Sequence, residues 1–183
     1  MLRSLRAQLS FIFLGFLLLV VSSVLVTFLA IQTQRDDATV INLAGRQRML
    51  SQKMTWLALA QPASNELTRA VELFDQTLYA LHDGGNTFDS TDHPVTLPAP
   101  PDAELRAQIG EAVRLWTTFR VHLQAGDAVT LQNESPRILA QLDSIVSAFE
   151  ARAQAKITRL QLTQFIFLIS AIVLLALGYL VTR

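Results

Sequence analysis

Apolar residues form two long uninterrupted runs, one near each end of the chain. Phe11 to Ala30 contains only apolar and small uncharged residues, and Phe165 to Val181 is a shorter run of the same kind. A helix rises about 1.5 Å per residue, so runs of this length can cross a hydrocarbon core of about 30 Å. We therefore predict transmembrane helices over residues 11–31 and 165–182. A secretory signal is the alternative for the first run, but its length and the lack of a clear small-x-small site favour an uncleaved anchor.

Residues 32–164 show a different pattern, in which apolar positions are separated alternately by three and four residues. This spacing is typical of the seams of helices packed in a bundle. No run alternates with a period of two over a useful length, so no strand is predicted. The fold class expected is all-α, an up-and-down four-helix bundle flanked by the two transmembrane helices. Four sets of seam positions follow one another along the chain. They are Val40, Leu43, Gln47, Leu50, Met54 and Leu57; Leu67, Val71, Phe74, Leu78 and Leu81; Leu105, Ile109, Val113, Trp116 and Leu123; and Ile138, Leu142, Ile145 and Phe149.

Turn and capping residues separate the four sets. Ser64 and Asp102 are plausible N-caps, and Ser135-Pro136 gives an N-cap followed by proline at the first helical position, which is a strong start signal for the fourth helix. Residues 82–101 form the long connection, rich in Gly, Asp, Thr and Pro. Gly126-Asp127 ends the third helix or bends the link to the next.

Charge indicates how the chain is oriented. Arg3 and Arg6 precede the first apolar run and Arg183 follows the second, while acidic residues are confined to the middle segment. By the positive-inside rule both termini, including residues 1–10, are expected in the cytoplasm, and residues 32–164 in the periplasm. The expected location is therefore the bacterial inner membrane.

The overall neutral composition conceals an acidic middle segment. Twelve of the 15 basic residues and all 15 acidic residues lie there, which gives it a formal net charge of −3. Such a segment is not suited to binding nucleic acid. The chain has no cysteine, so disulfides and thiolate metal sites are excluded.

Three basic residues lie in a stretch of the predicted first helix that has no acidic neighbour. At about 100° per residue, Arg48 and Gly45 fall on a stripe away from the seam, while Arg46 and Lys53 fall on neither face. Glycine inside a helix costs about 1 kcal/mol relative to alanine, which close approach of a backbone or a ligand can offset. Arginine beside it suits a small oxyanion; a solvated surface arginine is the alternative. The stripe comprises Ile41, Gly45, Arg48, Gln52, Thr55 and Leu59.

The motif INLAGRQRMLSQKM, Ile41 to Met54, resembles the signature of PilJ-type sensor domains (the type IV pili methyl-accepting chemotaxis transducer N-terminal domain). It is also similar to the P-box of NarX/NarQ-type nitrate sensor kinases. A second stretch, Asn133 to Ala153, resembles the later part of PilJ-type domains. The resemblance implies a periplasmic four-helix sensor domain, dimeric about its first helix. It also implies an anion, nitrate or nitrite, held between the Arg48 side chains of two subunits. The further anion-binding candidates are Gly45, Asn42, Ser51 and Gln52.

Arg46 and Gln47 depart from the uncharged pair of the nitrate sensors, so nitrate is inferred from the family rather than from these residues. The sequence gives weaker support for any other kind of functional site. Acidic and histidine residues in the long loop fit no metal-binding spacing, and a solvated loop is the alternative. His122 has no catalytic partner at helical spacing. Trp56 and Trp116 are expected near packing layers, and an aromatic residue beside a site is the alternative. We expect no enzyme activity, no cofactor and no metal. The loop residues in question are His82, Asp83, Asp89, Asp92 and His93.

The sequence thus predicts a homodimeric, two-pass membrane sensory module. The alternative is a ligand-free scaffold or chemoreceptor-like module that dimerises and docks other envelope proteins. The sequence after the second apolar run is too short for an output domain. Output therefore belongs either to a separate cytoplasmic signalling partner or to the rest of a longer protein.

Overall fold

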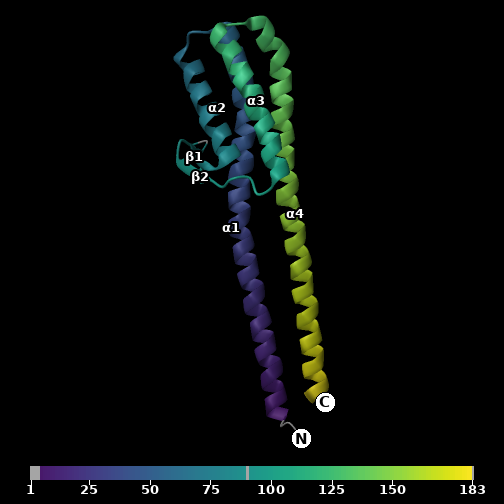
Figure 1. Cartoon of the computed structure of the whole chain (residues 1–183). Helices are drawn as coiled ribbons and strands as arrows, with labels where there is room; N and C mark the ends of the chain where they lie inside the picture. The colour runs from purple at the N-terminus through teal and green to yellow at the C-terminus, as the bar shows by residue number, and fades with distance from the viewer. Residues whose placement is uncertain (1–4, 90, 183) are drawn as a thin grey trace. The chain divides into compact units, whose positions relative to one another are not determined.

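The structure is a computed structural model that describes residues 5–89 and 91–182. The described residues form four helices and a two-stranded antiparallel sheet (Figure 1). They divide into two compact units, which we describe separately: the bundle unit, Asp37–Ala151, and the paired-helix unit, whose described part is residues 5–36 and 152–182. The elements are α1 (Leu5–Ala60), α2 (Asn65–Asp83), β1 (Gly85–Phe88), β2 (Pro94–Leu97), α3 (Ala103–Ala125) and α4 (Ala128–Thr182).

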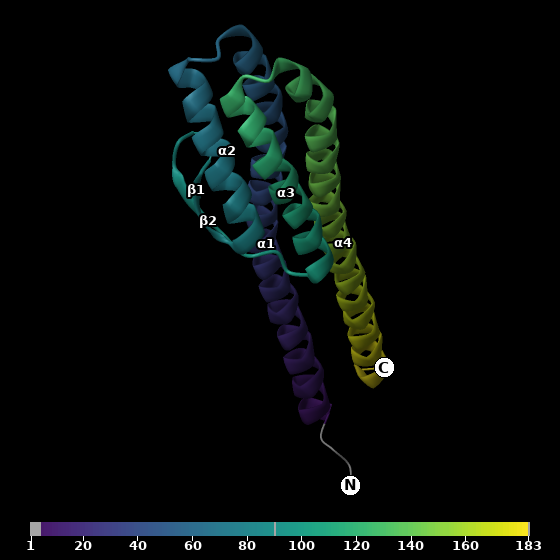
Figure 2. The ribbon, with the colours of Figure 1, turned by 45° about the horizontal axis from the view of Figure 1, so that its top comes forward.

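The bundle unit is a four-helix bundle, as predicted (Figure 2). Most of the seam positions that the apolar spacing identified are buried in its core, because each seam turns one stripe of its helix toward the other three; Val71, Val113 and Phe149 are only partly buried against it. All six positions of the first seam, including the polar Gln47, are buried. Trp116 packs against Phe74 with ring centroids 4.3 Å apart, and its indole N–H donates to the Asp75 carboxylate (2.7 Å).

Most of the predicted helix ends are confirmed. The Ser64 hydroxyl accepts from the backbone N–H of Leu67 (3.2 Å), and the Asp102 carboxylate accepts from that of Leu105 (2.8 Å). These bonds satisfy N–H groups that have no partner within the helix. Gly126 ends α3 in the left-handed conformation, at a φ of 66°.

The predicted start of the fourth helix at Ser135-Pro136 is wrong. Helix α4 begins at Ala128 and carries Pro136 inside it. The Asp127 carboxylate accepts from the backbone N–H of Thr130 (3.2 Å), and Leu131 in the first turn is fully buried. An earlier cap and an apolar anchor therefore outweigh the cost of one proline in the third turn.

The prediction of no strands is also wrong, because the long connection contains a hairpin of β1 and β2. Gly85 pairs with Leu97 at one end of the ladder and Phe88 with Pro94 at the other. The hairpin lies beside α2 (Figure 1). Each strand has only four residues, and in β1 the single inward side chain is Thr87, whose hydroxyl lies 2.8 Å from that of Thr77 on α2. An inward-facing threonine produces no apolar alternation.

Gly84 joins α2 to the hairpin in a conformation that L residues rarely adopt, with a φ of 79°. A Cβ at this position would lie 2.9 Å from the backbone nitrogen of Ala99. Both the backbone conformation and the close approach therefore require glycine here.

The paired-helix unit consists of the N-terminal part of α1 and the C-terminal part of α4, whose apolar side chains are largely exposed. Among the described residues, two helices are long and apolar enough to cross a membrane. Polar side chains join them: Ser23 donates to the Gln164 side-chain oxygen (2.9 Å), and the Gln164 amide donates to the Thr27 hydroxyl (2.8 Å). The predicted orientation rests on Arg3, Arg6 and Arg183, and of these Arg3 and Arg183 lie outside the described residues.

Candidate ligand-binding site

The five candidate residues all lie on the part of α1 that belongs to the bundle unit, but they do not share one face. Asn42, Arg48 and Gln52 are exposed, and Gly45 is half-buried. Ser51 is buried, and its hydroxyl donates to the backbone carbonyl of Arg48 (2.8 Å). The outer surface of α1 therefore offers four of the five residues to a ligand or partner, while Ser51 supports the turn that carries Arg48.

Arg48 lies at the edge of this surface and has an acidic partner in the fold. Its Nε lies 2.8 Å from a carboxylate oxygen of Asp143 on α4, and the two side chains are 45% and 52% exposed. Lys53 forms a similar pair with Glu66 on α2, at 2.6 Å. The absence of acidic residues near these cations in sequence therefore does not leave them unpaired in space.

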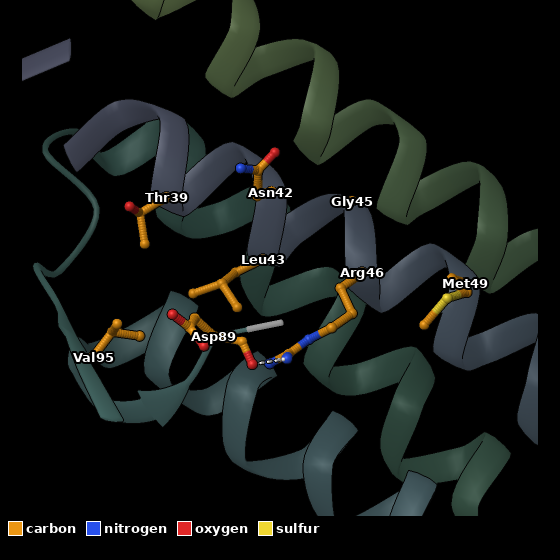
Figure 3. A pocket seen from close by; sticks show the side chains of 8 residues that line it. All are labelled: Thr39, Asn42, Leu43, Gly45, Arg46, Met49, Asp89 and Val95. Carbon is orange, nitrogen blue, oxygen red and sulfur yellow. Dashed lines mark hydrogen bonds between the residues drawn. The ribbon is translucent and has the colours of Figure 1, made fainter. Parts of the chain in front are cut away.

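Arg46 points toward the hairpin rather than toward the surface of α1 (Figure 3). Its Nη1 donates to the backbone carbonyl of Asp89 (2.6 Å), and its Nη2 donates to that of Phe88 and, at 3.4 Å, to the Thr77 hydroxyl. Burial lowers the pKa of Arg46, while the nearby carboxylates of Asp89 and Asp92 act in the opposite direction. Arg46 thus connects the hairpin to α1 by hydrogen bonds. Its position around the helix alone did not identify this role.

A cavity of about 660 Å³ lies between α1 and the hairpin, beside Arg46 (Figure 3). It combines apolar walls with an arginine, a carboxylate and an amide. The Asp89 carboxylate is already engaged, because it accepts from the backbone N–H groups of Thr91 and His93. These bonds, with that of His93 the strongest influence, lower the pKa of Asp89. The lining residues are Thr39, Asn42, Leu43, Gly45, Arg46, Met49, Asp89 and Val95.

The exposed stripe of α1 differs from the predicted one by a small rotation. Ile41 is half-buried, and the Thr55 hydroxyl lies 3.2 Å from the Ser135 hydroxyl of α4, so these two positions turn toward the protein. Trp56 is 59% exposed, which makes its predicted place in a packing layer wrong, whereas Trp116 is buried as predicted. We call the row of positions that runs along the outward surface of α1 the outer stripe, and Arg48 lies at its edge. The outer stripe consists of Asn42, Gly45, Met49, Gln52, Trp56 and Leu59.

Gln47, between the two arginines, is fully buried, and its side-chain amide has no hydrogen-bond partner among the described residues. An unpaired buried amide is costly, by about 1–3 kcal/mol. The sequence predicted its position on the seam, but spacing gives no information about partners for a polar core residue. Elsewhere in the described residues, no group of three histidine, aspartate or glutamate side chains lies close enough to hold a metal ion.

Comparison with known proteins gives several matches, among them one protein family and one solved sensory domain. The family described as type IV pili methyl-accepting chemotaxis transducer N-term (PilJ) matches residues 29–145. The ligand-binding domain of the P. aeruginosa nitrate receptor McpN is similar in structure, with a TM-score of 0.54 and 26% sequence identity over 63% of this chain and 96% of that one. No curated protein matches the chain.

Both matches are to sensory domains, and the family match covers more than half of the chain, including the outer stripe and the candidate residues. The four-helix architecture and the two helices that can cross a membrane are in keeping with a membrane receptor. The chain belongs to the PilJ family and is a sensory module of signal transduction.

Proposed function

We propose that this module binds a small anion, nitrate or nitrite first, between the α1 helices of a homodimer. The observation that carries the proposal is Arg48 at the edge of the outer stripe, one turn from Gly45. The similar McpN domain is that of a nitrate receptor, which supports this choice of anion. The anion-binding residues are Arg48, Gly45, Asn42 and Gln52, with Ser51 behind them.

The outer stripe supports the homodimer. Its residues are spaced alternately by three and four positions, which is the spacing of a coiled-coil seam, yet five of the six are exposed in a single chain and Gly45 is only half-buried. Met49 and Trp56 are 55% and 59% exposed. A Cβ added to Gly45 would meet nothing within 4 Å, so the close approach that explains this glycine is left to a second copy.

Arg48 can supply the positive charge for the anion. Its ion pair with Asp143 is made through Nε, at 2.8 Å, and the Arg48 side chain is 45% exposed. A guanidinium offers a planar fork of donors that matches a planar oxyanion. At a twofold axis along the outer stripe, two such forks face one another and can hold one anion.

The module is proposed to sit in the bacterial inner membrane with residues 32–164 in the periplasm and both termini in the cytoplasm. Residues 11–31 and 165–182 cross the bilayer, and the signal passes to a cytoplasmic partner or segment. A reporter that is active only in the periplasm should work when it is fused near Gly85 and fail when it is fused after Arg183. The reverse pattern contradicts this orientation.

Thermal melting of the segment 32–164 with and without nitrate tests the anion site. A ligand at 100 times its dissociation constant should stabilise the folded protein by about 2.7 kcal/mol. Arg48→Ala should abolish this gain. Arg114→Ala, which removes an exposed arginine paired with Glu111 on α3, should retain it. A segment that dimerises but melts identically with and without nitrate and nitrite would favour the ligand-free scaffold instead.

A further inference from the structure

We propose that Asp143 is an internal counter-ion that the incoming anion displaces from Arg48, so that ligand binding opens a contact between α1 and α4. This inference rests on the proposed anion site at Arg48. It adds a residue on a different helix, and it specifies which contact in the single chain changes when the ligand binds.

The geometry of the pair allows exchange. The Arg48 Nε and the Asp143 carboxylate oxygen are 2.8 Å apart, and about half of each side chain is exposed. Exposed pairs of this kind are weak, because water and salt screen them and because both side chains lose freedom on pairing. An anion from solution can therefore compete for the same guanidinium.

Charge makes that competition necessary. Two Arg48 side chains facing one another, each with its own Asp143, form a neutral group of four charges. An anion added to this group gains nothing from net charge and is repelled by both carboxylates. If each arginine exchanges Asp143 for the shared anion, the two guanidinium groups surround one negative charge and form charge-assisted hydrogen bonds to it.

The exchange changes a contact between the two helices that also form the paired-helix unit. Arg48 lies on α1 and Asp143 on α4, and both helices contribute residues to both units. The neutral hydrogen bond between Thr55 and Ser135, about two turns away on the same pair of helices, has no charge for the anion to displace. Ligand binding therefore releases α1 from α4 at Arg48 and Asp143, while the two helices stay joined at Thr55 and Ser135.

The inference is tested by titrating the full chain in detergent with nitrate and measuring binding by calorimetry at constant ionic strength. Asp143→Asn removes the competing charge and should tighten nitrate binding about two- to fivefold, the range that an exposed ion pair represents. Asp143→Glu keeps the charge and should bind nitrate like the wild type. Because Asp143 is exposed, both variants should melt within a few degrees of the wild type when nitrate is absent.

The chain provides a matched control in Glu66, which pairs with Lys53 of α1 at 2.6 Å with similar exposure. Glu66→Gln makes the same change in net charge and should leave nitrate affinity unchanged within about twofold. Equal tightening by Glu66→Gln and Asp143→Asn would show a general effect of charge and would overturn the proposal.

The remaining outcomes separate this inference from the proposed function. Weaker or unchanged nitrate binding in Asp143→Asn, with binding still lost in Arg48→Ala, would overturn displacement and make Asp143 a positioning residue or a bystander. Nitrate binding that survives Arg48→Ala would overturn the anion site itself. Absence of nitrate binding in both the wild type and Asp143→Asn would overturn both.

Discussion

The three basic residues of the α1 motif have three different environments, although they lie within eight positions of one another. Arg46 is half-buried and holds backbone carbonyls of the hairpin, Arg48 is exposed beside Asp143, and Lys53 pairs with Glu66. The sequence distinguished Arg48 from Arg46 and Lys53, because the direction of a side chain around a helix follows from its spacing alone. It did not identify their partners, because the face that α4 turns toward α1 depends on packing of the whole bundle.

Gly45 provides a prediction at this scale. Gly45→Ala should stabilise the isolated segment 32–164 as a monomer by up to about 1 kcal/mol, because alanine favours the helix and the added methyl meets nothing in the single chain. The same substitution should weaken dimerisation and the nitrate response, because the methyl keeps the two α1 helices apart. Urea unfolding at low protein concentration and nitrate-dependent melting measure the two effects.

Gly110→Ala on α3 is the matched control for that substitution. It places a methyl in another helical glycine position, 3.4 Å from the His82 ring, and should leave the nitrate response unchanged. A nitrate response that is equally strong in Gly45→Ala and in the wild type would show that no second backbone approaches Gly45.

At the scale of elements, the helices could be predicted and the hairpin could not. Each helix has a seam of apolar residues that repeats over several turns, and such repetition identifies a helix whatever surrounds it. Strands β1 and β2 are four residues each and are held by Arg46 and by the pair Thr77–Thr87. Those contacts use polar groups and join residues ten or more positions apart, so no local pattern predicts them. The start of α4 was misplaced because Ser135-Pro136 is a locally stronger signal than Asp127.

Pro136 tests the observed start of α4. Inside a helix, proline removes a backbone hydrogen bond and crowds the preceding turn, so Pro136→Ala should stabilise the bundle by about 1–3 kcal/mol. Urea unfolding of the segment 32–164 measures the change. If the helix began at Pro136, where proline is favoured, the same substitution would be neutral or slightly destabilising. Gly126→Ala, at a φ of 66°, should destabilise in either case.

At the scale of the whole molecule, the outer stripe predicts how two chains meet. The protein has no cysteine, so single introduced cysteines report contacts between copies without interference. Met49→Cys and Trp56→Cys, both on the outer stripe, should form disulfides between subunits in the membrane. Thr55→Cys should not, because Thr55 turns toward Ser135 of its own chain. Disulfide formation at Thr55→Cys that is stronger than at the two stripe positions would place the dimer contact on a different face.

In a bilayer, the hydrogen bonds among Ser23, Thr27 and Gln164 restrict rotation of the two helices more than sliding. Lipid tails offer no alternative partner to a glutamine amide, so separating the two helices leaves the Gln164 amide unsatisfied. A turn of α4 by one residue, about 100°, carries the amide away from both hydroxyls. A displacement of about 1–2 Å along the helix axis, the size of common helix shifts, can be absorbed by the torsions of the long glutamine side chain. We therefore expect a signal that uses this pair of helices to travel as a movement along the membrane normal and not as a twist.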